Sequence, residues 1–153
     1  MGLFDDLGRA RAGGSREYGR GNRPTSSKAQ ILFERGRAML SNQEDGGIEC
    51  IMEAIGAGSS DAALYVADIY LDLFIDEYPH GFSPRYNDID NAKTFCNFHL
   101  IAEYLGASES QLRPRLSRFL SCFSDNEDID YFQNEIYLPL RMQIFNRLRM
   151  EGL

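Results

Sequence analysis

The chain has 153 residues, of which 43% are hydrophobic and 25% charged, values that are ordinary for one globular domain. Its apolar runs fall short of the roughly 18 residues that a membrane-spanning helix needs, and the start MGLFDDLGRAR lacks the apolar core of a secretory signal. Residues 1–28 hold six basic and three acidic side chains, whereas the remaining 125 residues hold ten basic and 20 acidic ones, for a net charge of −7. An acidic body disfavours nucleic acid and favours a basic protein partner.

Residues 1–27 are interpreted as a flexible tail that precedes an all-α domain over residues 28–153. The stretch GRARAGGSREYGRGNRPTSS is rich in Gly, Arg and Ser, so it cannot bury enough apolar surface to offset the entropy lost on ordering. Its arginines leave open an alternative function, a nucleic-acid-associated protein whose tail follows phosphate backbones.

The first three predicted helices follow the tail. Ser27-Lys28-Ala29-Gln30 fits a capping box that starts the first helix, and the turn residues NQEDGG end it. The second and third helices are predicted over about 48–57 and 61–75 from their helical spacing of apolar residues. Their core-facing stripes are predicted to be Ile48, Ile51, Met52 and Ile55 in the second helix, and Ala62, Val66, Ile69, Tyr70 and Leu73 in the third.

Three further helices are predicted after the loop YPHGFSPRYN. They run from Asp88 or Asp90 to Gly106, over 109–123, and over 129–150 with a kink at Pro139, which lacks a backbone donor. Pro114 is tolerated near the start of the fifth helix. Because no segment alternates cleanly enough to form a strand, the predicted fold is all-α: about six helices in stacked antiparallel hairpins, a short α-solenoid.

The stretch AIGAGSSDAALYVADIY contains glycines that could form either a phosphate-binding loop or a corner between two helices. A phosphate-binding loop follows a buried strand, but the preceding residues GIECIMEAI have helical spacing. Asp61 stands where the third glycine of GxGxxG belongs, and the chain has no Gly-Lys-Ser/Thr. We therefore predict a helical corner in which Gly58 adopts the left-handed conformation.

The same stretch resembles the Sel1-like repeat, a relative of the tetratricopeptide repeat. The residues that carry the likeness are Ala54-Ile55, Gly58, Ala62, Val66-Ala67 and Tyr70, with Ile55 replacing an alanine of the pattern and Ala67 a glycine. A second, degenerate copy is carried by Asp90, Ala92, Phe95, Ala102 and Gly106, and ends at Pro114 and Arg118. Over residues 28–106, the resemblance implies stacked helical hairpins that bind another protein in a groove and have no chemistry of their own.

Two clusters resemble metal sites but lack ligands. Cys96 and His99 lie three residues apart, yet the only other histidine is His80 and no CxxC pair exists, so both are interpreted as core residues. DNEDID (125–130) lacks the glycine and terminal Glu of a calcium loop and is interpreted as a turn that caps the sixth helix.

The remaining signals predict no catalytic residue, no cofactor and no metal. The chain has neither a GxSxG motif nor a Ser-His-Asp order, although an enzyme with a pocket between the hairpins stays an alternative. Cys50, Cys96 and Cys122 are odd in number and widely spaced among apolar neighbours. They predict buried reduced thiols and a cytoplasmic protein.

Acidic residues recur at every fourth position of the third helix: Asp68, Asp72 and Asp76, with Glu77 beside them. Such a row is either a solvated face opposite Val66, Tyr70 and Leu73 or a stripe that receives Lys or Arg from a partner. Tyr65 and Tyr78 would frame the stripe. The predicted function is a non-enzymatic protein-binding module that masks a basic partner, such as an immunity protein, an antitoxin or an adaptor.

Overall fold

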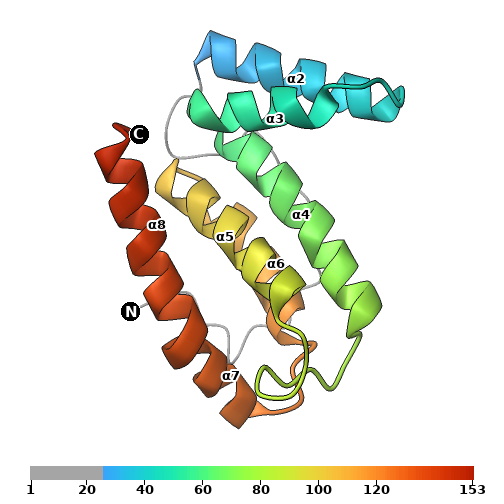
Figure 1. Ribbon diagram of the computed structural model, residues 1–153, viewed down its shortest axis with the longest axis vertical. Coiled ribbons are helices and arrows are strands. Elements are labelled where there is room, and N and C mark those ends of the chain that lie inside the picture. The colour runs from blue at the N-terminus through green and yellow to red at the C-terminus, as the bar shows by residue number, and fades with distance from the viewer. Residues whose placement is uncertain (1–25) are drawn as a thin grey trace.

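Residues 26–153 form an all-α fold in the computed structural model (Figure 1). Residues 1–25, and with them almost all of the predicted tail, lie outside the described residues. The helices are α2 (Ser27–Ser41), α3 (Gly47–Gly56), α4 (Ser60–Glu77), α5 (Asp90–Tyr104), α6 (Glu109–Leu120), α7 (Asn126–Phe132) and α8 (Leu138–Met150). In residues 26–153 the one β-type contact is an isolated bridge between Phe82 and Phe123, so the predicted all-α class is confirmed.

The helices are arranged as two antiparallel pairs joined at a corner (Figure 1). α2 packs along α3 at one end of the molecule, and α4 leaves the corner to pack along α5. α6 lies behind α5 and also contacts α4, while α8 flanks α5 on the side away from α4. The corner makes α3 and α4 diverge.

The corner between α3 and α4 depends on a glycine, as predicted. Gly58 has φ +101°, and the amide of Ser59 donates to the carbonyl of Ala54 at 2.9 Å. A turn of the same kind follows α5, where Gly106 has φ +105° and Ala107 donates to Ala102 at 2.9 Å. In both turns a left-handed glycine satisfies carbonyl groups that the ending helix leaves unpaired.

The ends of two helices differ from the predictions. The first helix is capped by Ser26, whose hydroxyl accepts from the amide of Ala29 at 3.1 Å, so the predicted capping box at Ser27 is one residue late. The sixth predicted helix is divided into α7 and α8 by a π-helical turn, Gln133–Tyr137. The turn ends two residues before Pro139, which cannot donate to the carbonyl of Glu135, and a wider turn accommodates that missing hydrogen bond.

Asp125 starts α7 by accepting a hydrogen bond from the amide of Asp128 at 2.9 Å, which confirms the predicted cap. Asp128 itself is buried and fixes the loop between α4 and α5. Ser83 and Arg85 donate to one of its carboxylate oxygens at 3.1 and 3.2 Å, and the Ser124 hydroxyl donates to the other. These hydrogen bonds hold the pKa of Asp128 below its usual value.

Phenylalanine rings fill the interior next to this loop. Neighbouring ring centroids lie 4.8 to 5.5 Å apart in a cluster made of Phe74, Phe82, Phe119, Phe123 and Phe132. Edge-to-face and tilted contacts of this kind add to the stabilisation that comes from burying the rings. The cluster fills the end of the α4–α5 pair that lies away from the corner.

Candidate functional site

The structure corrects the prediction that Asp68 belongs to an exposed acidic stripe. Asp68 is 3% exposed and lies between α4 and α6, where Arg115 donates from Nε to one carboxylate oxygen at 2.7 Å and from Nη2 to the other at 3.1 Å. Arg115 is equally buried, and its Nη1 donates to the carbonyl of Gln111 at 2.7 Å. Asp68 is therefore a structural residue and is not available to a partner.

The two tyrosines that were predicted to frame the stripe lie at opposite ends of α4. Tyr65 is half-buried against Phe33 of α2, with ring centroids 5.9 Å apart, and the Arg37 guanidinium lies over both rings. Tyr78 packs on the phenylalanine cluster, and its hydroxyl accepts from the amide of Asp88 at 3.2 Å. The two rings do not border one surface.

The other three acidic residues of the predicted stripe are accessible. The Asp72 side chain is 45% exposed and lies 3.9 Å from the guanidinium of Arg118. Asp76 and Glu77 are exposed, and Glu77 accepts a hydrogen bond from the Asn91 side chain at 3.4 Å. Of the predicted residues, Asp72 and Asp76 remain one turn apart on the same exposed face.

The exposed face of α4 also carries aliphatic side chains that the sequence analysis placed in the core. Leu73 is 46% exposed and Ile69 is half-buried, whereas Leu71 and Phe74 are fully buried. The predicted stripe is therefore wrong at Leu73. Residues 69, 72, 73 and 76 share one face of a helix, so this face mixes aliphatic and acidic groups.

Helix α3 repeats that arrangement. Ile48 and Met52, which were also predicted to face the core, are 47% and 45% exposed, while Ile51 and Ile55 are buried. Glu49 and Glu53 are exposed and lie one position further along the chain from each aliphatic residue. Both helices thus leave an aliphatic pair one turn apart at least partly accessible, although Ile69 of α4 is half-buried, and each has an acidic pair one turn apart beside it.

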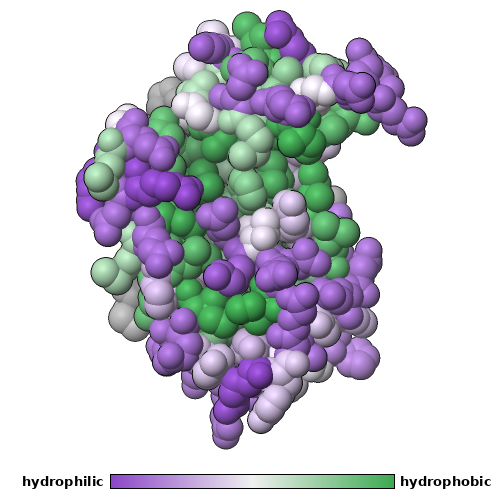
Figure 2. All heavy atoms as spheres, viewed as in Figure 1, coloured by the Kyte–Doolittle hydropathy of each residue, from purple (hydrophilic) through white to green (hydrophobic). Residues whose placement is uncertain are grey.

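The diverging parts of α3 and α4 border a hollow on the molecular surface. Figure 2 shows this hollow at the right-hand edge, beneath the overhanging end of the α2–α3 pair, with hydrophobic residues gathered over α3 and α4. The aliphatic residues that these helices leave accessible are the exposed Ile48, Met52 and Leu73 and the half-buried Ile69, and the acidic residues beside them are Glu49, Glu53, Asp72 and Asp76. We refer to these eight residues as the α3–α4 face.

Cys96 and His99 lie in the core, away from this face. Both are fully buried, and His99 Nε2 lies 3.0 Å from the carbonyl oxygen of Leu112, while its Nδ1 has no hydrogen-bond partner. Burial lowers the pKa of His99 and raises that of Cys96, so the imidazole is neutral and the thiol unreactive. No three His, Cys, Asp or Glu side chains of residues 26–153 are grouped to hold a metal ion.

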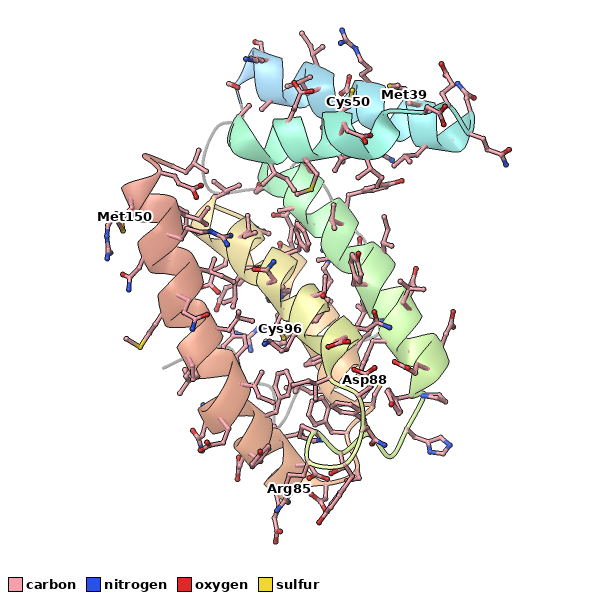
Figure 3. All side chains as sticks on the ribbon, viewed as in Figure 1. Met39, Cys50, Arg85, Asp88, Cys96 and Met150 are labelled. Atoms are coloured by element: carbon pink, nitrogen blue, oxygen red, sulfur yellow. The ribbon has the colours of Figure 1, made fainter. Side chains whose placement is uncertain are left out.

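The three cysteines form no disulfide, and Cys50 differs from the prediction because it is only half-buried. Cys122 is buried like Cys96, but Cys50 is half-buried on α3, where its Sγ lies 3.8 Å from Met39 Sδ of α2 (Figure 3).

None of the helices in the described part of the chain is long and apolar enough to cross a membrane. Models of protein families, curated proteins and solved structures give no match to this chain.

Proposed function

We propose that this protein is a non-enzymatic interaction module that binds a basic protein partner on the α3–α4 face. The observation that carries the proposal is the repeated arrangement on α3 and α4, two helices that border one hollow, where exposed or half-buried aliphatic residues stand beside acidic ones. Half-exposed aliphatic side chains grouped in a hollow are typical of binding surfaces. The acidic pairs would attract and orient a basic partner.

The charge of the described residues supports a basic partner. Residues 1–25 contain five of the 16 basic and three of the 23 acidic side chains, which leaves 11 basic and 20 acidic ones in residues 26–153, a net charge of −9. A field of this sign raises the rate at which a basic protein associates and repels nucleic-acid phosphates. Masking of a basic toxin by an immunity protein or antitoxin, in the cytoplasm, fits this chemistry, and so does an adaptor role.

The resemblance to Sel1-like repeats agrees with a protein-binding role, and we retain it as part of the proposal. Ala54 and Ala102 are both fully buried, and each is followed four residues later by a left-handed glycine. Small residues before a glycine turn allow close packing of successive helices. Repeats of this kind bind partners on a concave side.

The test is capture of partners from a native lysate by the full chain and two charge-reversal variants. Glu53→Lys/Asp76→Lys changes one exposed acid on each helix of the α3–α4 face, and Lys near a helix C-terminus is compatible with its dipole. The matched control, Asp130→Lys/Glu135→Lys, makes the same charge change at exposed positions next to α8. The proposal expects a basic protein that the wild type and the control retain and the first variant loses; equal retention by all three would contradict it.

A further inference from the structure

We propose that the segment of the partner that occupies the hollow is a basic amphipathic α-helix. This inference rests on the proposed function and adds the secondary structure and residue pattern of the ligand. The spacing of the aliphatic pairs, the absence of a strand edge and the position of the acidic pairs each support it.

The aliphatic pairs have the spacing that a helix recognises. Ile48 and Met52 are one turn apart on α3, and Ile69 and Leu73 are one turn apart on α4. Rows of residues four apart form the ridges that interdigitate with the grooves of another helix. The two rows lie on diverging helices, so a third helix placed between them would contact both, with aliphatic residues at i, i+3 or i+4, and i+7.

Other modes of peptide recognition lack the groups they need. An extended peptide binds by adding a strand to an open sheet edge, but the described residues contain only the isolated bridge between Phe82 and Phe123. A proline-rich peptide binds between exposed aromatic rings, and Tyr65, the aromatic residue on this side of α4, is packed against Phe33 and covered by Arg37. A helix, whose own backbone hydrogen bonds are internal, needs neither feature.

The acidic pairs define the flanks of the ligand. Glu49 and Glu53 stand beside the aliphatic pair of α3, and Asp72 and Asp76 beside that of α4, so both helices that border the hollow carry accessible acidic groups. A helix with Lys or Arg next to its aliphatic stripe would place those cations near the carboxylates. An acidic helix would bring further negative charge close to the exposed carboxylates of Glu49, Glu53 and Asp76.

The test is selection from a displayed library of random peptides of about 16 residues, roughly four helical turns, on the full chain. Counter-selection uses the variant Met52→Ser/Leu73→Ser, which removes one exposed aliphatic residue from each helix. We expect the enriched peptides to carry aliphatic residues at helical spacing beside Lys or Arg, and to gain helical far-UV circular dichroism on binding. Their affinity for the variant should fall by about tenfold or more.

Met142→Ser provides the matched control, because Met142 is 68% exposed on α8, outside the α3–α4 face; it should leave the affinity unchanged. The inference would be overturned by enriched peptides that lack helical periodicity. It would also be overturned by peptides that bind Met52→Ser/Leu73→Ser and Met142→Ser with equal affinity. If a basic protein is captured through Glu53 and Asp76 but no helical peptide competes with it, the helix inference fails and the proposed function stands. If neither a protein nor a peptide depends on the α3–α4 face, both fail.

Discussion

Arg115 holds Asp68 through two parallel hydrogen bonds in the interior, although the two residues are 47 positions apart in the chain. The pair joins α4 to α6, and both side chains are almost completely buried. A buried ion pair is a weak source of net stability, because each charge loses its hydration, but removing one partner leaves the other charge uncompensated. This asymmetry leads to the first prediction.

Arg115→Met should lower the free energy of unfolding by about 3–5 kcal/mol, because it strands the carboxylate of Asp68 in the interior. The matched control is Arg118→Met, which removes a partly exposed guanidinium 3.9 Å from Asp72 and should change stability by less than about 1 kcal/mol. Urea denaturation of the two variants measures the difference. Equal losses of stability in the two variants would contradict the burial of the Asp68–Arg115 pair.

His99 should make stability depend on pH. Burial lowers its pKa in the native state, so as the pH falls through about 6.5 the unfolded chain takes up a proton before the native protein does, and stability decreases. Above about pH 6.5 His99 is neutral in both the native and the unfolded states, so its contribution to stability no longer depends on pH. His99→Gln, which keeps a donor for the carbonyl of Leu112, should flatten the dependence of the urea midpoint between about pH 7 and pH 5.

His80, the other histidine, is exposed on the loop after α4 and supplies the control. His80→Gln should leave the slope of the wild type unchanged. A slope that disappears in the His80 variant and persists in the His99 variant would contradict the assignment.

Two glycines in one corner should respond to alanine with opposite signs. Gly58 has φ +101° and nothing within 4 Å of an added Cβ, so Gly58→Ala meets no clash but forces alanine into the left-handed region, at a loss of about 1–2 kcal/mol. Gly56 ends α3, also has open space around it and has no positive φ. Gly56→Ala should therefore be neutral or stabilise by up to about 1 kcal/mol. Thermal unfolding of the two variants, monitored by circular dichroism, tests the pair.

Leu71 and Leu73 test which side of α4 faces the core. Leu71→Ala should destabilise by about 2–5 kcal/mol, since its side chain is fully buried. Leu73→Ala removes the same atoms at a position that is 46% exposed and should lower stability by less than about 1 kcal/mol. Chemical denaturation would contradict the orientation of α4 if Leu73 proved the more sensitive position.

The features that depend on neighbouring residues could be predicted from the sequence. The features that depend on residues far apart in the chain could not. The left-handed Gly58 and the Asp125 cap depend on a few consecutive residues, so the pattern identified them correctly. The orientation of α4 depends on Arg115, which reaches Asp68 from another helix. Charge placed Asp68 on the exposed side and the helical spacing of apolar residues placed Leu73 in the core, and the structure reverses both.

The acidic half of the α3–α4 face was found in part, because Asp72 and Asp76 are exposed as the solvated-face interpretation requires. Its aliphatic half was missed, since the exposed aliphatic residues of both helices have the spacing of core residues. No local signal separates them from core residues, because the fully buried Leu71 is likewise followed directly by the accessible Asp72.

The corner at Gly58 has a mechanical consequence. The α2–α3 pair contacts the remainder of the described protein chiefly through α4, so the angle between the two helical pairs is held by a small contact area and one turn. Amide protons of α2 and α3 should then exchange with solvent through a sub-global opening of lower free energy than those of α4 and α5. A ligand bound between the α2–α3 pair and α4 would suppress that opening and fix the angle between the two helical pairs.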